Sequence, residues 1–131
     1  MKKIQFLMLT GIFIMFAGVS SMSAQEFMKT DAKIVKVLAD TTYMTAMEVT
    51  FPPGYTSNTH THPAHFVYAL TDGTLSVSYT DGTKEEFSMK AGDNFSGAPE
   101  RPHTTMNTTK MPVKFILVEF KDHPYKLSMK K

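Results

Sequence analysis

Residues 54–73 have the sequence GYTSNTHTHPAHFVYALTDG, which holds three of the five histidines in the chain. Neutral imidazole is the commonest nitrogen ligand for first-row transition metals. His60 and His62 are two positions apart, and such side chains lie on the same face of a β-strand. His103 follows about 40 residues later, on what would be a different strand. The pattern indicates a metal site inside a β-barrel, where strands distant in sequence meet.

The sequence around this stretch is typical of an all-β domain. After residue 25 no segment keeps a 3.6-residue apolar period over three turns, and short runs of β-branched and aromatic residues recur between turn signals. Asp81-Gly82 predicts a hairpin with a type I′ turn. Roughly eight strands separated in this way favour one sandwich or barrel. We expect strands at residues 32–38, 42–51, 65–70, 74–80, 83–89, from Phe95 onward, at 103–107 and at 113–120.

The run 54–73 also resembles the first signature of the cupin superfamily. That signature is a glycine, five residues, His-x-His, three or four residues, a glutamate, six residues and a glycine. His60 and His62 stand at the two histidine positions. Counting back from the final glycine places the glutamate position on Phe66, so the carboxylate is missing. The resemblance leaves His65, one position earlier, as a candidate replacement.

The second cupin signature has a counterpart at residues 92–107. It begins with glycine and ends with a proline, a glycine, a histidine and an asparagine at set intervals. His103 falls eleven residues after the first glycine, and Asn107 follows after three intervening residues. Ala98 and Glu100 occupy the expected proline and glycine positions. By analogy, Asn107 is expected to contact the site.

The resemblance covers about residues 51–120 and implies one domain, a single cupin-type jelly-roll barrel over residues 25–131. It also implies one divalent transition metal ion as cofactor. Iron, manganese, nickel, zinc and copper all accept nitrogen-rich sites, so the residues do not choose among them. The expected metal ligands are His60, His62, His65 and His103.

His65 is the member of this set whose position the sequence leaves open. Simple alternation puts His65 on the opposite face of the strand from His62. Pro63 cannot donate to a strand ladder, and a bulge there would turn His65 inward. One alternative is a closed four-histidine site. The other is a three-histidine site with an open position for water or substrate.

The first 24 residues have the pattern of a secretory signal peptide. Lys2 and Lys3 precede an apolar run at residues 6–19, and small residues follow at Ser20, Ser21, Ser23 and Ala24. We expect cleavage after Ala24 and a periplasmic or extracellular protein, the alternative being a retained membrane anchor. Loss of the two lysines would lower Lys plus Arg from 14 to 12, equal to the 12 Asp plus Glu. A neutral mature chain without a basic stripe argues against nucleic acid as a partner, and after cleavage no membrane association is expected.

Function is predicted only as a class. The first hypothesis is a metal-dependent oxygenase, isomerase or lyase acting on a small polar molecule, with Glu119 as the first candidate base if it points inward. The alternative is a non-catalytic module that binds a small ligand or a sugar.

The chain has no cysteine, which excludes thiolate metal sites and thiol catalysis. A homodimer is expected, because an apolar strand at residues 32–38 would need a cover.

Overall fold

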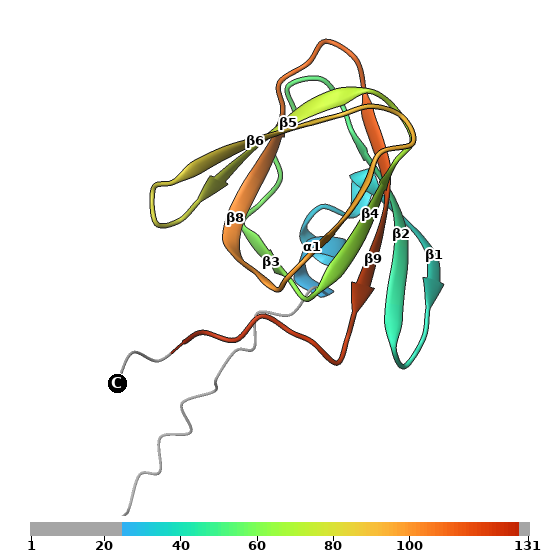
Figure 1. The fold of residues 1–131 in the computed structure, drawn as a ribbon, viewed down its shortest axis with the longest axis vertical. Helices are drawn as coiled ribbons and strands as arrows, with labels where there is room; N and C mark the ends of the chain where they lie inside the picture. The colour runs from blue at the N-terminus through green and yellow to red at the C-terminus, as the bar shows by residue number, and fades with distance from the viewer. Residues whose placement is uncertain (1–24, 129–131) are drawn as a thin grey trace, which may run out of the picture.

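The computed structural model describes residues 25–128, so the predicted signal peptide lies outside the described residues. Two antiparallel sheets pack face to face (Figure 1). One sheet has the strand order β1-β2-β9-β4-β7 and the other has the order β3-β8-β5-β6. The elements are α1 (Gln25–Thr30), η1 (Ala32–Ile34), β1 (Val35–Asp40), β2 (Met44–Phe51), β3 (His60–His62), β4 (His65–Ala69), β5 (Gly73–Tyr79), β6 (Lys84–Met89), β7 (Asn94–Gly97), β8 (Glu100–Asn107) and β9 (Val113–Phe120). Within the described range, no helix has the length and apolar character needed to cross a membrane.

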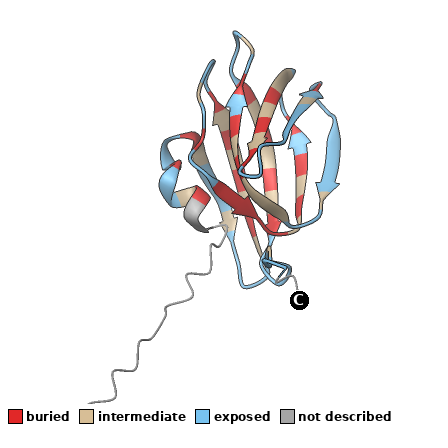
Figure 2. Cartoon of the chain, turned by 90° about the vertical axis from the view of Figure 1, so that its left-hand side faces the viewer, coloured by how far each residue is buried: buried red, intermediate tan, exposed pale blue. Residues whose placement is uncertain are grey.

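Alternation of apolar and polar residues explains which faces are buried. β2 pairs with β9 along its whole length, and every second residue of both strands is buried (Figure 2). β9 also pairs with β4, which confirms the prediction that residues 113–120 form a central strand. On β5 the inward residues are those expected from the alternation, namely Leu75, Val77 and Tyr79.

The chain departs from the sequence prediction where it passes from one sheet to the other. The stretch of residues 60–69 is two strands, because β3 belongs to the four-stranded sheet and β4 to the five-stranded sheet. Pro63 lies in the crossing, where its missing N–H removes no ladder hydrogen bond. The first expected strand is also shifted, since η1 occupies residues 32–34 and β1 begins at Val35.

The predicted hairpin is confirmed, but its turn is of another type. β5 and β6 pair from Gly73↔Met89 to Ser78↔Lys84. Within this turn only Gly82 has a positive φ, at +91°, whereas a type I′ turn needs positive φ at two residues. The Asp81 carboxylate instead accepts hydrogen bonds from the backbone N–H and the hydroxyl of Thr83, at 2.9 and 2.6 Å. This side-chain bond stabilises the turn while Asp81 keeps an ordinary φ.

Candidate metal centre

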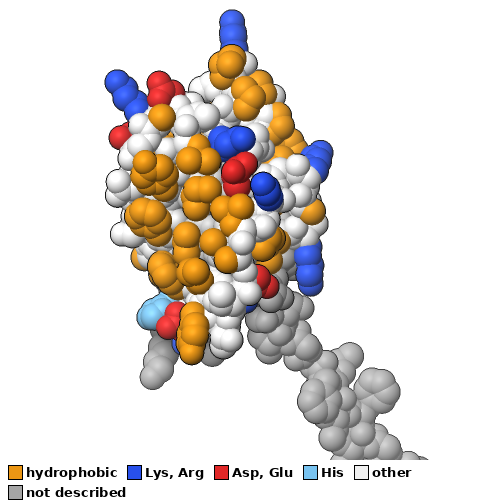
Figure 3. Space-filling view, turned by 90° about the vertical axis from the view of Figure 1, so that its right-hand side faces the viewer, with side chains coloured by type: hydrophobic (Ala, Val, Ile, Leu, Met, Phe, Trp, Pro, Cys, Tyr) orange, Lys and Arg blue, Asp and Glu red, His pale blue; other side chains and the backbone are white. Residues whose placement is uncertain are grey.

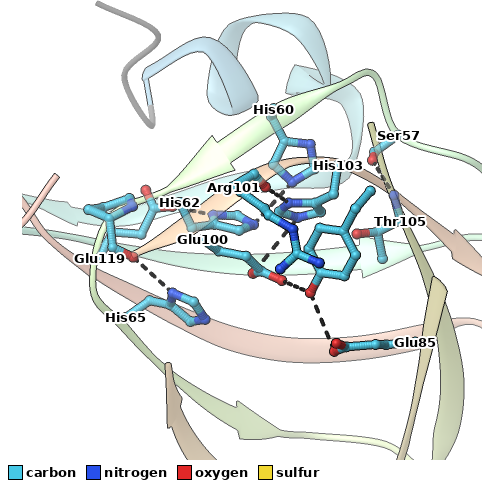
Figure 4. A network of polar contacts seen from close by, with 12 residues as sticks. Ser57, His60, His62, His65, Glu85, Glu100, Arg101, His103, Thr105 and Glu119 are labelled. Carbon is cyan, nitrogen blue, oxygen red and sulfur yellow. Dashed lines mark hydrogen bonds and ion pairs between the residues drawn. The ribbon is translucent and has the colours of Figure 1, made fainter. Parts of the chain in front are cut away.

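Three of the predicted ligands meet at one point between β3 and β8. His60 faces His103 directly in the antiparallel register, and His62 is two residues from His60 on the same strand. One ring nitrogen from each of the three lies within 4.8 Å of the others (Figure 4). All three residues are buried, with exposed fractions of 8% or less. His60, His62 and His103, which we call the imidazole cluster, therefore form a group that could hold a metal ion.

Backbone carbonyl groups fix the ring orientation of two members of the cluster. Nδ1 of His60 donates to the carbonyl oxygen of Asn58 at 2.7 Å. Nδ1 of His103 donates to the carbonyl oxygen of Arg101, also at 2.7 Å. Because Nδ1 carries the proton in both rings, the lone pair lies on Nε2. A metal ligand held in one tautomer in this way needs no reorientation before it binds the ion.

The third member of the cluster is held by an acidic side chain. Nδ1 of His62 and Oε1 of Glu119 are 2.6 Å apart, and Glu119 is only 2% exposed. The sequence named Glu119 as the first candidate base if it points inward, and in the structure it is buried with His62 as its partner. A carboxylate behind a ligating imidazole orients the ring and raises its basicity. Glu119 therefore acts on His62, so the geometry favours a positioning residue over a base.

Burial keeps the cluster in the form that binds metals. Burial and the nearby imidazoles lower the pKa of His60 to about 2 and that of His62 to about 3. Both rings are therefore neutral at pH 7. Burial also raises the pKa of Glu119 to about 8, so in the metal-free fold this side chain is mostly protonated at pH 7 and is hydrogen-bonded to the neutral ring of His62. A neutral, nitrogen-rich donor set fits a divalent transition metal ion better than calcium or magnesium.

His65 lies beside the cluster on the opposite sheet. Its ring centroid is 5.3 Å from that of His62, and its Nδ1 donates to the carbonyl oxygen of Pro63 at 2.8 Å. The His65 ring lies against β7, because a Cβ added at Gly97 would come within 2.4 Å of His65 Nε2. His65 is not a member of the group whose nitrogens converge. Its role as a fourth ligand therefore stays a prediction.

The N-terminal helix covers the cluster. Phe27 of α1 is 2% exposed, and its ring centroid is 4.4 Å from that of His60. Asp31, which follows the helix, accepts hydrogen bonds from the Tyr55 hydroxyl and from the backbone N–H of Asn58. Since the carbonyl of Asn58 holds His60, the same contacts that fix the helix also support the imidazole cluster.

A second acidic residue at the site was not predicted. Oε1 of Glu100 accepts a hydrogen bond from the Tyr79 hydroxyl at 2.6 Å, and Oε2 lies 3.9 Å from Nε2 of His103. Burial and the hydrogen bond to Glu100 raise the pKa of Tyr79, so its hydroxyl stays protonated and donates. The Arg101 guanidinium stacks on the Tyr79 ring, 3.6 Å from its centroid. The only sequence signal was that Glu100 stands where the second cupin signature has a glycine.

Asn107 does not reach the imidazole cluster. Its amide nitrogen donates to the carbonyl oxygens of Phe51 and Met111, and its Oδ1 accepts from the backbone N–H of Thr109. Asn107 is fully buried and joins the end of β8 to the loop that leads into β9. These contacts give it a structural role at the far end of the barrel.

A cavity of about 470 Å³ adjoins the cluster between the two sheets. Its wall is mostly apolar, although a small polar substrate was expected from the sequence. The reason is that inward positions on the strands are filled by aliphatic and aromatic residues. The apolar part of the wall includes Phe51, Val67, Leu75, Val77, Phe87, Met89, Phe95, Phe115 and Leu117.

The chain belongs to the cupin family, because the family model described as "Cupin domain" matches residues 47–119. The matched region contains the imidazole cluster and both acids that contact it. The resemblance inferred from the two histidine signatures is thereby confirmed, as is the prediction of a single all-β barrel of the cupin type.

Solved structures with the same fold come from several bacteria. A cupin domain from Bordetella pertussis Tohama I is 24% identical with a TM-score of 0.62, and the match covers 67% of this chain and 92% of that one. A Klebsiella pneumoniae protein with a double-stranded β-helix domain is 23% identical with a TM-score of 0.55, covering 74% and 84%. The Cupin_2 domain of an XRE family transcriptional regulator from Enterobacter cloacae is 19% identical with a TM-score of 0.51, covering 71% and 96%. At these identities the likeness shows the fold alone. A search of curated proteins found no match.

Proposed function

We propose that the protein is an exported cupin that binds one divalent transition metal ion through His60, His62 and His103. A small organic molecule binds in the adjoining cavity. The observation that carries the proposal is the convergence of three buried imidazole nitrogens at the wall of that cavity. The proposed chemistry is a metal-dependent oxygenase, isomerase or lyase reaction.

Different residues of the chain have different roles in such a site. Three protein ligands leave at least one coordination position open, which is the arrangement of catalytic metal centres. A bound divalent ion would act as a Lewis acid toward an oxygen atom of the substrate. Glu119 holds the ring of His62, and Phe27 keeps water away from the back of His60. The apolar wall excludes water from the bound molecule, which strengthens electrostatic interactions at the open position.

The experiment is a metal analysis of the mature chain purified without a histidine tag. We expect about one transition metal ion per chain in the wild type and loss of that ion in His60→Ala. His123→Ala is the matched control, because His123 is exposed and its ring is hydrogen-bonded to the neighbouring Asp122. Equal trace amounts of metal in all three proteins would overturn the proposal.

A non-catalytic ligand-binding module is the second candidate. It is favoured by the apolar wall of the cavity, which offers contact area to a ligand but few groups that move protons. The two candidates differ in turnover. A metal-dependent enzyme converts the bound molecule, whereas a binding module returns it unchanged after denaturation and extraction.

Export is proposed from the pattern of residues 1–24. The test is N-terminal sequencing of the protein recovered from its native host. A chain that begins at Gln25 would support cleavage after Ala24. A chain that retains the leader and sediments with membranes would support the anchor instead.

Self-association is proposed across the edge strand β1. Val37 and Leu38 on this strand are 49% and 48% exposed, and hydrophobic side chains gather on this side of the molecule (Figure 3). An open strand edge with apolar side chains favours pairing with a second copy. Light scattering should give a dimer that Val37→Lys converts to a monomer. Leu127→Lys, which changes an exposed apolar residue in the C-terminal tail, should leave the dimer intact.

A further inference from the structure

The five-stranded sheet changes from polar to apolar along the inside of the barrel. In this sheet the inward-facing residues of β4 lie opposite the inward-facing residues of β9. At one end His65 is paired with Glu119, and the next inward pair is Val67 and Leu117. Phe115 follows on β9, still inside the barrel. Both strands therefore present their polar side chain at the same end and only apolar side chains beyond it.

The four-stranded sheet repeats this arrangement. Tyr79 on β5 is paired with His103 on β8, beside the imidazole cluster. The next inward pair is Val77 and Thr105, and Leu75 follows on β5. The polar ends of both sheets meet at the cluster, because His62 on the four-stranded sheet contacts Glu119 on the five-stranded sheet. The cavity is thus polar at the cluster and mostly apolar along the rest of its length, with Thr105 as the exception among these inward residues.

We propose that the ligand of this cavity is amphipathic, with an uncharged apolar body of about two fused rings and an oxygen donor at the end that faces the imidazole cluster. The proposal rests on the function proposed above and specifies the substrate class of the same site. It replaces the small polar molecule expected from the sequence with a molecule whose polarity is confined to one end.

The size of the body follows from the volume. An apolar cavity of about 150 Å³ holds benzene. The cavity here is about 470 Å³, roughly three times that volume. One ring would leave most of the wall without contacts, whereas two rings and an oxygen substituent would fill it more completely.

The apolar character of the body follows from the wall. A hydroxyl or charged group beyond the cluster would face side chains such as Phe51, Met89 and Phe115, none of which accepts or donates a strong hydrogen bond. An unpaired buried polar group costs more than an apolar contact gains. Arg101, the basic residue in the wall, is ion-paired with Asp81 at 2.9 Å and bonds Thr83 at 2.8 Å, so its charge is already compensated. Sugars and phosphorylated metabolites therefore fit this cavity poorly.

The test compares three probes by calorimetry on the mature protein as purified: 2-naphthol, phenol and glucose. The second ring of 2-naphthol buries additional apolar surface, so 2-naphthol should bind about tenfold more tightly than phenol. Glucose should show no saturable binding. Binding of glucose that equals or exceeds that of 2-naphthol would overturn the proposal.

A matched pair of variants on β5 locates the probe. Val77 faces the cavity and its neighbour Ser76 faces away from it. Val77→Phe should weaken 2-naphthol binding at least tenfold by filling the cavity, and Ser76→Phe should leave it unchanged. Phe87→Ala, at a half-buried position of the wall, removes contact area without overpacking and should weaken binding several-fold. Equal affinities in all three variants would place the probe elsewhere and overturn the proposal.

Metal content separates this inference from the function on which it rests. If the wild type holds no metal but binds 2-naphthol in a Val77-dependent manner, the metal proposal fails and the ligand class stands. If the wild type holds about one metal ion but prefers glucose, the ligand class fails and the metal proposal stands.

Discussion

His103 and His65 are held by the same local contact but reach different surroundings. Each donates from Nδ1 to a carbonyl oxygen two residues earlier, on Arg101 at 2.7 Å and on Pro63 at 2.8 Å. His103 lies on the four-stranded sheet and joins the imidazole cluster, whereas His65 lies on the five-stranded sheet against Gly97. The local backbone sets the tautomer of a histidine, and the sheet that carries it decides what the free nitrogen faces.

The largest expected effect tests this difference directly. His103→Ala removes a converging nitrogen and should weaken metal binding by more than about 100-fold, a loss beyond that caused by outer contacts. His65→Ala should weaken it by less than about tenfold. Competition with a chelator of known affinity measures both. Equal large losses in the two variants would make His65 a ligand and the site a four-histidine one.

The acid stability of the metal-free protein tests whether burial controls the cluster. The unfolded chain protonates His60 and His62 near pH 6.5, whereas in the fold their pKa values are about 2 and about 3. Below pH 6.5 the unfolded state therefore binds two more protons. The pKa of Glu119 is raised from 4.5 to about 8, so between these pH values the folded state binds one more proton at Glu119 than the unfolded state does. Stability should be maximal near pH 6.5.

The slopes follow from these proton counts at about 1.4 kcal/mol per proton and pH unit. The free energy of unfolding should fall by about 1.4 kcal/mol per unit from pH 6.5 to 4.5, and by about 2.7 kcal/mol per unit from pH 4.5 to 3. It should also fall as the pH rises from 6.5 toward 8, because the unfolded chain has already ionised Glu119 while the fold still keeps this carboxyl protonated. Urea unfolding at several pH values measures the profile. Glu119→Gln should abolish the fall above pH 6.5, and a fall retained in this variant would refute the assignment.

A third prediction concerns the contact that joins the two sheets. Glu119→Gln replaces the carboxylate behind His62 with an amide and should weaken metal binding by about 10- to 100-fold. The matched control is Glu48→Gln, because Glu48 lies in the same sheet but forms a surface ion pair with Lys114 at 3.4 Å. Isothermal titration with the metal ion that the metal analysis of the wild type identifies measures both. An unchanged affinity in Glu119→Gln would limit the role of Glu119 to stability.

Two acids near Tyr79 offer a finer comparison. Glu100 contacts the Tyr79 hydroxyl at 2.6 Å and also faces His103, whereas Glu85 lies 3.4 Å from the same hydroxyl. Because a carboxylate near the cluster stabilises a bound cation, Glu100→Gln should weaken metal binding by about tenfold. Glu85→Gln should leave it within about twofold. If both variants behave alike, Glu100 serves Tyr79 and not the metal.

The sequence was sufficient for the barrel and for two members of the cluster because these depend on short-range patterns, whereas His103 was found through the resemblance of residues 92–107 to the second cupin signature. Alternation fixed the buried face of β5, and the His-x-His spacing placed His60 and His62 together. The contact between His62 and Glu119 spans 57 positions, so no local pattern contains it. Glu100 was missed because the register of β3 and β8 shifts between His60 and His62 and sets His62 opposite Glu100. The location of His65 depended on a crossing between sheets, which alternation along one strand cannot describe.

The smallest expected effect on the metal comes from displacing His65 alone. A Cβ at Gly97 would lie 2.4 Å from His65 Nε2, and a Cβ at Gly73 would lie 2.3 Å from a methyl group of Val113. Gly97→Ala and Gly73→Ala should each destabilise the fold by about 1–3 kcal/mol through overpacking, measured by thermal unfolding. Metal affinity should change less than about twofold in both, because neither substitution touches the imidazole cluster. A loss of affinity confined to Gly97→Ala would show that His65 supports the metal from the opposite sheet.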